Sequence, residues 1–180
     1  GCSVNEYQSM AASIIEECDS LTELINTMLD ISEVETGAGR VSFGVIRMDD
    51  MVRDVCELFE PLAEKKNQTL ICHAPEPLRI RGDLRKIQRM VSNLVDNAIK
   101  YSPASGTVTI SLDENKEGQI LLCVGDTGMG ISPDDLPFIF DRFYRGDRSR
   151  SETGNGLGLS LVRAIVRAHR GRITVQSEPD

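Results

Sequence analysis

The sequence has no tryptophan, no apolar run long enough to span a membrane, and no signal-peptide pattern at its start. Its hydrophobic content of 40% and charged content of 27% are typical of a globular protein. A chain of 180 residues can form one ample domain, or one domain with a smaller element. We therefore expect a globular protein in which no segment of this sequence spans a membrane.

Basic residues are absent before Arg40, and the net charge of the chain is −8. This acidic balance argues against wholesale binding of nucleic acid, so we expect no nucleic-acid partner. Arginines dominate only from Arg142 to Arg172, where one region can still attract an anion.

The five cysteines have no paired spacing of the kind that binds metals. Their odd number and dispersed positions fit a reducing compartment better than a disulfide framework. We therefore expect a cytoplasmic protein, or the cytoplasmic part of a membrane-anchored one.

The first segment, from about Val4 to Val34, is predicted to form one long helix. Apolar residues recur along it in alternating steps of four and three, which is a heptad pattern. These residues are Tyr7, Ala11, Ile14, Cys18, Leu21, Ile25 and Met28. The helix either packs on its own globular domain or forms half of an antiparallel hairpin that dimerises. We favour dimerisation, because the pattern is long and the sequence contains no partner helix.

The remaining residues, 39–180, are predicted to form one domain after a short hinge at Thr36–Gly39. Alternating apolar residues predict strands near 41–45, 69–73, 108–112, 120–124 and 172–176. Helices are expected from a cap at Asp49 or Asp50 to Lys66, near 137–143, and from Gly156 to His169, with an aperiodic loop at 145–154. The fold class is therefore α+β: a two-layer sandwich of helices over a mixed, mostly antiparallel sheet, preceded by one long coiled-coil-like helix.

The most informative stretch ends a helix that should run from Asp83, its N-cap, to Tyr101. Asn93, Asn97 and Lys100 fall within an arc of about 60° on the face opposite the apolar stripe. Carboxamide oxygens can ligate Mg²⁺, and an ammonium group can contact a phosphate. The alternative is an ordinary solvated face, and this stretch alone does not decide between the two.

Two glycine-rich segments follow. In Asp126-Thr127-Gly128-Met129-Gly130, a buried carboxylate at the end of a strand can accept a hydrogen bond from an exocyclic amine. In Gly154-Asn155-Gly156-Leu157-Gly158, backbone amides at the start of a helix can face phosphate oxygens. Separately, each is weak evidence, because the first can be a simple turn and the second a flexible hinge.

Taken together and in this order, these motifs resemble those of sensor histidine kinases. Asn93 to Tyr101, Asp126 to Gly130, Phe140 to Arg145 and Gly154 to Gly158 resemble the N, G1, F and G2 boxes. The segment from Leu29 to Glu35 resembles the end of the second dimerisation helix of that family. The same ATP-binding fold occurs in DNA gyrase, mismatch-repair ATPases and the heat-shock chaperone, but the segment 140–145 and the acidic first helix favour the kinases.

The resemblance implies a site for ATP and Mg²⁺. It assigns Mg²⁺ to Asn97, the phosphates to Asn93 and Lys100, the adenine to Tyr101 and Asp126, and the γ-phosphate to Arg145. The implied catalytic residues are Asn93, Lys100 and Arg145. The implied nucleotide-binding residues are Asn93, Asn97, Lys100, Tyr101, Asp126, Gly128, Gly130, Phe140, Arg145, Gly154, Gly156, Leu157 and Gly158.

The implied function is transfer of the ATP γ-phosphate to a histidine, followed by relay to an aspartate of a response-regulator receiver domain. Residues 1–38 would form a partial dimerisation helix, and residues 39–180 a catalytic domain without its final strand. We expect the phosphoacceptor helix to lie outside this sequence and the N-terminal helix to form a homodimer. We expect His73 and His169 to be structural residues. The alternatives are a non-catalytic nucleotide-binding or dimerisation module and a gyrase-type ATPase.

Overall fold

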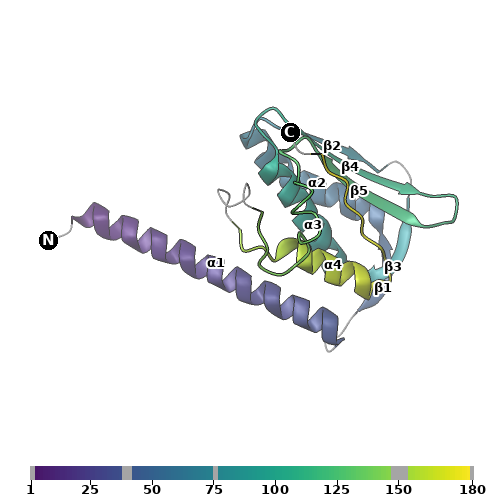
Figure 1. Ribbon diagram of the computed structural model, residues 1–180, viewed down its shortest axis with the longest axis horizontal. Coiled ribbons are helices and arrows are strands. Elements are labelled where there is room, and N and C mark those ends of the chain that lie inside the picture. Colours follow the sequence, from purple (N-terminus) through teal and green to yellow (C-terminus); the bar gives the residue numbers. More distant parts are fainter. Residues whose placement is uncertain (1–2, 38–41, 75–76, 147–153, 179–180) are drawn as a thin grey trace.

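The computed structural model describes residues 3–37, 42–74, 77–146 and 154–178. Helix α1 (Val4–Thr36) is a single long helix, as the heptad pattern predicts. Its N-terminal part projects away from the rest of the molecule, while its C-terminal part lies beside α4 (Gly158–Ala168) (Figure 1). Within the described ranges, no helix is long and apolar enough to cross a membrane.

The strands form two small sheets instead of one. In the first sheet, β1 (Phe43–Arg47) pairs antiparallel with β3 (Arg79–Asp83), a strand that the sequence did not suggest. In the second, β4 (Thr107–Glu114) pairs in parallel with β2 (Thr69–His73) and antiparallel with β5 (Ile120–Asp126). The expected α+β class with mixed strand pairing is confirmed, and the β4–β5 hairpin has the expected position.

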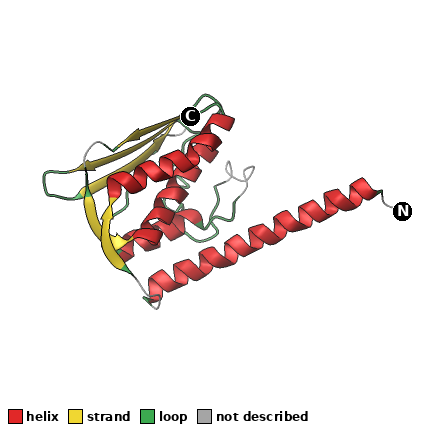
Figure 2. Ribbon diagram, turned by 180° about the vertical axis from the view of Figure 1, so that it is seen from behind, coloured by secondary structure: helices red, strands yellow, loops and turns green. Residues whose placement is uncertain are grey.

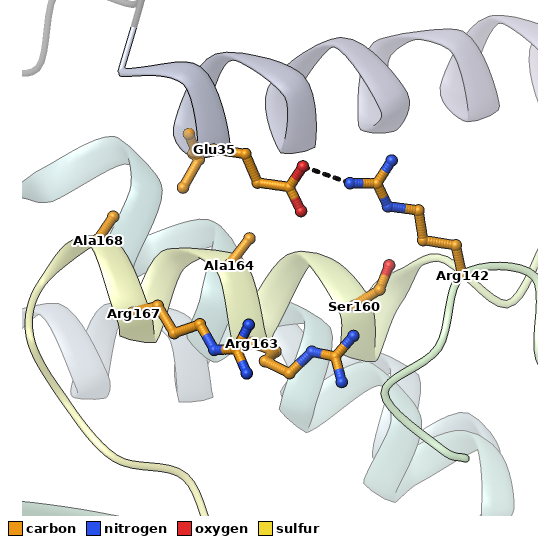
Figure 3. A pocket seen from close by; sticks show the side chains of 8 residues that line it. Glu35, Arg142, Ser160, Arg163, Ala164, Arg167 and Ala168 are labelled. Carbon is orange, nitrogen blue, oxygen red and sulfur yellow. Dashed lines mark hydrogen bonds and ion pairs between the residues drawn. The ribbon is translucent and has the colours of Figure 1, made fainter.

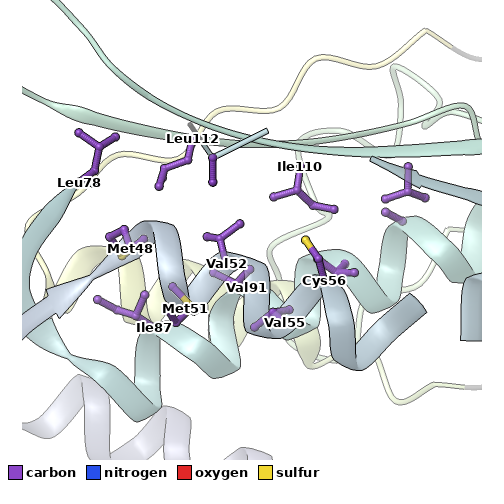
Figure 4. Packing of buried hydrophobic residues seen from close by; sticks show 14 of the residues in the cluster. Met48, Met51, Val52, Val55, Cys56, Leu78, Ile87, Val91, Ile110 and Leu112 are labelled. Carbon is purple, nitrogen blue, oxygen red and sulfur yellow. The ribbon is translucent and has the colours of Figure 1, made fainter. Parts of the chain in front are cut away.

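The main core lies between the second sheet and helices α2 (Met48–Lys65) and α3 (Leu84–Tyr101). The helices cover one face of the strands (Figure 2). Val52 and Val55 of α2 pack with Val91 of α3 beneath Ile110 of β4 (Figure 4). Alternate residues of β4 are buried, so the period-two pattern of this strand correctly identified its inner face.

The predicted start of α3 is confirmed, but that of α2 is wrong. The Asp83 carboxylate accepts a hydrogen bond from the Lys86 amide at 3.2 Å, which satisfies one free amide of the first turn. At α2 the N-cap is Arg47, without a side-chain cap, and Asp49 and Asp50 lie in the first turn. Both carboxylates pair there with the Arg47 side chain instead.

Two further elements differ from the prediction. Segment 137–143 forms successive turns, not a helix, because its hydrogen bonds mostly span three residues and Pro137 has no amide to donate. Segment 172–176 runs without strand pairing in the described part of the chain. Near its end, the Ser177 hydroxyl accepts a hydrogen bond from the Ile131 amide at 2.8 Å.

His169 ends α4 and joins it to the start of α3. Its Nδ1 donates to the Ile165 carbonyl at 2.8 Å, and its Nε2 accepts from the Asp83 amide at 3.0 Å. Because a carbonyl can only accept and an amide can only donate, these bonds require the neutral ring with its proton on Nδ1. These two bonds give His169 the structural role that the sequence predicts.

Candidate functional site

The polar face of α3 is covered by the glycine-rich segment that precedes α4. A Cβ atom on Gly158 would lie 2.9 Å from Asn93 Oδ1 and 3.8 Å from Asn97 Nδ2. A Cβ atom on Gly154 would lie 2.8 Å from Lys100 Nζ. The structure thus brings together three side chains and two glycines that are about 60 residues apart in sequence.

Asn93 is held in one orientation by its own helix. Its Nδ2 donates to the Arg89 carbonyl at 2.8 Å, one turn earlier. The amide oxygen therefore faces away from this bond and toward Gly158. An oriented carboxamide oxygen beside a glycine-rich segment is a suitable ligand for a hard cation or a partner for a hydrated one.

Gly156 requires the absence of a side chain. Its φ of +68° is in the left-handed region, and a Cβ atom there would lie 2.8 Å from the Tyr144 carbonyl oxygen. The Gly156 carbonyl also accepts from the Phe143 amide at 3.0 Å. These contacts hold the peptide just before Arg145 against the glycine-rich segment, close to α3.

The Tyr144 side chain anchors the same region from the other direction. Its hydroxyl donates to Asp135 at 2.6 Å, and this bond, followed by one from Ser132, lowers the pKa of Asp135. Arg145 is half-buried next to this anchor. The backbone that leads into Arg145 therefore lies beside the glycine-rich segment.

The loop after β5 contacts the last turn of α3. The Gly128 amide donates to Asp126 Oδ1 at 2.9 Å, and the Met129 amide donates to the Tyr101 carbonyl at 3.4 Å. A Cβ atom on Gly128 would lie 2.7 Å from that carbonyl, so a larger residue would push the loop away. The Asp126 carboxylate is exposed, whereas the sequence suggested a buried one. It is therefore accessible to a ligand.

Two of the expected nucleotide-binding residues have their side chains elsewhere. Phe140 packs under the Arg163 guanidinium, whose Cζ is 5.8 Å from the ring centre. The Leu157 side chain is fully buried in a cluster with Ile31 of α1 and Leu161 of α4. Any contribution of Leu157 to ligand binding must come from its backbone.

A cavity of about 320 Å³ lies on another side of α4, between this helix and the end of α1 (Figure 3). Glu35 of α1 and Arg142 form an ion pair across its rim. The hydrogen bond from Arg142 lowers the pKa of Glu35, despite the opposing effect of partial desolvation. Because the pKa of Glu35 is lowered in the folded protein, the ion pair stabilises the packing of α1 at pH values above the ordinary pKa of a glutamate. This stabilisation is lost as the pH falls through the lowered pKa of Glu35.

Sequence reasoning did not identify the residues that dock α1 on the domain. Arg89 of α3 pairs with Asp30 and also donates to the Thr27 hydroxyl at 3.0 Å. The ion pairs are partly exposed and contribute less than about 1 kcal/mol each, so the apolar cluster around Ile31 dominates. The C-terminal part of α1 therefore packs on its own domain, which is the first of the two arrangements considered for this helix from the sequence.

No group of three or more histidine, cysteine, aspartate or glutamate side chains in the described ranges forms a metal site. A cation near α3 would instead use carboxamide oxygens, phosphate oxygens and water. Magnesium commonly binds in this way, with few protein ligands. The orientation of Asn93 and the position of Asn97 on the same face fit such a cation.

Residues 82–180 match the family model of histidine kinase-, DNA gyrase B- and HSP90-like ATPases. The chain belongs to this family. The match spans α3, the β4–β5 hairpin and α4, which are the elements that form the candidate site.

Several curated proteins and solved structures that are similar to this chain are kinases. Sensor protein SphS of Synechococcus elongatus is 35% identical over 185 residues, which cover 97% of this chain and 44% of SphS. Full-length ShkA, solved in complex with AMPPNP, has a TM-score of 0.78 and 28% identity over 91% of this chain and 34% of ShkA. Histidine kinase AdeS of Acinetobacter baumannii has a TM-score of 0.71 and 25% identity over 89% of this chain and 73% of AdeS.

The resemblance to sensor histidine kinases is thus confirmed, together with the catalytic-domain fold. The relatives favour this branch of the family over the gyrase-type alternative. Because the chain spans less than half the length of SphS, it corresponds to only part of such a protein.

Proposed function

We propose that this chain binds ATP with Mg²⁺ on the polar face of α3 and donates the γ-phosphate to a histidine. The observation that carries the proposal is the close approach of Gly154 and Gly158 to Lys100 and Asn93. Amides of a glycine-rich segment at a helix start, an ammonium group and oriented carboxamides form a typical polyphosphate site. The AMPPNP complex of ShkA supports the choice of nucleotide.

In this proposal each residue has a defined task. Asn97 ligates Mg²⁺, which neutralises charge on the phosphates, and Asn93 and Lys100 orient the phosphate oxygens. Arg145, which follows the Phe143 and Tyr144 backbone that contacts Gly156, stabilises negative charge as the γ-phosphoryl group moves. Tyr101 packs near the adenine, and Asp126 accepts a hydrogen bond from the adenine amino group.

Nucleotide binding can be tested by titration calorimetry with ATP in the presence and absence of Mg²⁺. We expect a single site, with tighter binding when Mg²⁺ is present. For Asn97→Ala we expect most of the effect of Mg²⁺ on affinity to disappear, because the carboxamide ligand is gone. Equal enhancement by Mg²⁺ in wild type and variant would remove Asn97 from the metal site.

The acceptor in this proposal is a histidine outside the sequence, and a receiver-domain aspartate of a response regulator is the next acceptor. His169 is committed to two structural hydrogen bonds, and His73 lies at the end of β2. Because ATP and receiver domains are cytoplasmic, we propose a cytoplasmic location. Residues 1–38 then serve as part of a dimerisation domain, and residues 39–180 as the catalytic domain.

We further propose that α1 forms a homodimer through its exposed apolar stripe. Tyr7, Ile14, Leu21 and Ile25 are each more than half exposed, whereas Ile31 near the other end is buried. An exposed stripe of this length favours pairing with another helix.

The dimer proposal predicts a concentration-dependent mass by light scattering. Ile14→Glu combined with Leu21→Glu should shift the chain to the monomer, because charges would then oppose each other within the helical interface. The matched control is Ser13→Glu combined with Ser20→Glu, at positions adjacent to the stripe. A wild-type chain that stays monomeric at the highest soluble concentration would contradict the proposal.

A further inference from the structure

The turn between α2 and β2 packs against the C-terminal end of α3. Asn67 in this turn has a φ of +55°, and its carbonyl accepts from the Ser105 amide at 3.0 Å. The residues on either side of it, Lys66 and Gln68, direct their side chains at the carbonyl groups that end α3. We call these two residues the α3 clamp.

The side-chain amide of Gln68 lies within hydrogen-bonding distance of three carbonyl groups, which share its two N–H donors. Its Nε2 donates to Ile99 O at 2.9 Å, to Ser102 O at 2.8 Å and to Pro103 O at 3.3 Å. The side chain is buried, with only 7% of the residue exposed. Three neighbouring acceptors fix the orientation of the amide, because a reversed amide would place its oxygen against three oxygens. The last turn of α3 is thereby held in place.

Lys66 adds a positive charge at the same end. Its Nζ donates to Ile99 O at 3.1 Å and to Lys100 O at 3.2 Å. The final carbonyl groups of a helix carry its negative partial charge, which would otherwise weaken the binding of anions nearby. The Lys66 ammonium offsets that charge within one turn of the Lys100 side chain.

Lys66 and Gln68 hold the last turn of α3, and this turn also carries residues that we propose contact the nucleotide. Lys100 and Tyr101 belong to it, and the Tyr101 carbonyl accepts from Met129 in the loop after Asp126. We infer that Lys66 and Gln68 are positioning residues for ATP: Gln68 fixes the last turn of α3, and Lys66 makes its end favourable for the phosphates. This inference rests on the proposed nucleotide function.

Lys66→Met tests the electrostatic part, because it keeps the length of the side chain and removes its charge. We expect ATP to bind roughly two- to five-fold more weakly, as for the loss of one charge at a helix terminus. Adenosine, which has no charge, should bind within about two-fold of wild type. Lys66→Arg should restore ATP affinity, because a guanidinium can also donate to both carbonyl groups.

Lys65→Met is the matched control. Lys65 is exposed in the last turn of α2, and its replacement removes the same net charge one residue away. Its affinity for ATP should stay at the wild-type value. If Lys66→Met equals this control, or weakens adenosine as much as ATP, the electrostatic role is wrong.

Gln68→Met tests the positioning part through hydrogen exchange and nucleotide affinity. We expect faster exchange of the amides of Tyr101 and Ser102 and roughly tenfold weaker ATP binding, because three carbonyl groups lose a buried partner. Gln88→Met, at an exposed position on α3, is the control. Unchanged exchange and affinity in Gln68→Met would overturn the role of Gln68. If the wild-type chain does not bind ATP, the proposed function is wrong. If the wild type binds ATP and the Gln68→Met variant binds it equally well, only the role of Gln68 is wrong.

Discussion

Asp126→Asn is expected to weaken the binding of ATP and ADP by roughly 10- to 150-fold. The exposed carboxylate of Asp126 is free to accept a charge-assisted hydrogen bond from the adenine amino group, which contributes roughly 1.5–3 kcal/mol. The asparagine can still accept from the Gly128 amide with its oxygen, so the loop after β5 should keep its shape. Titration calorimetry at constant Mg²⁺ measures the effect.

The control for this change is Asp113→Asn. Asp113 is an exposed carboxylate on β4, the strand that pairs with β5, and the substitution changes the net charge equally. It should leave nucleotide affinity and thermal unfolding unchanged. If Asp126→Asn binds ATP as well as this control does, Asp126 does not contact the adenine.

Leu157→Ala should lower the free energy of unfolding by roughly 2–5 kcal/mol, the range for removal of a fully buried leucine side chain. The side chain fills the cluster that joins α1 to α4, so its loss leaves a cavity at that junction. Chemical denaturation measures the effect. Hydrogen exchange should also show faster opening of the C-terminal turns of α1.

Nucleotide affinity in Leu157→Ala should change less than in Asp126→Asn, because the backbone of residue 157 is retained. Leu121→Ala is the control, since Leu121 is 60% exposed on β5 and should change stability by no more than about 0.5 kcal/mol. A Leu157→Ala variant of wild-type stability that no longer binds ATP would show that the side chain faces the ligand instead of the core.

The parts of the fold with strong periodicity were predictable from the sequence. The stripe on α3 and the alternation in β4 each follow from burial of one face, which depends on local spacing alone. The heptad spacing in α1 correctly predicted a single long helix, although most of its apolar residues are exposed in the structure. The polar face of α3 was predictable for the same reason, because it is the opposite face of an identified helix. The proximity of Gly154 and Gly158 to that face was suggested only by the resemblance to a family.

The other features of the fold and of the candidate site depend on contacts between distant residues, which no local sequence pattern encodes. Strand β3 is short and contains Gly82, so its pairing with β1 is determined by the tertiary fold. The burial of Leu157 depends on α1 lying against α4, and α1 is more than 120 residues away in sequence. The bonds from Lys66 and Gln68 to the end of α3 are similarly non-local, and neither residue type marks a site in sequence.

Transfer of phosphate from γ-labelled ATP tests the central claim most directly. The chain is incubated with labelled ATP and Mg²⁺, alone and with a separate dimerisation domain that contains a phosphoacceptor histidine. We predict acid-labile label on the added domain and none on the chain itself, because His169 lies about 15 Å along α4 from the glycine-rich segment and holds two structural hydrogen bonds. Label on the chain alone that disappears in His73→Ala or His169→Ala would contradict the account, as would the absence of label from both proteins.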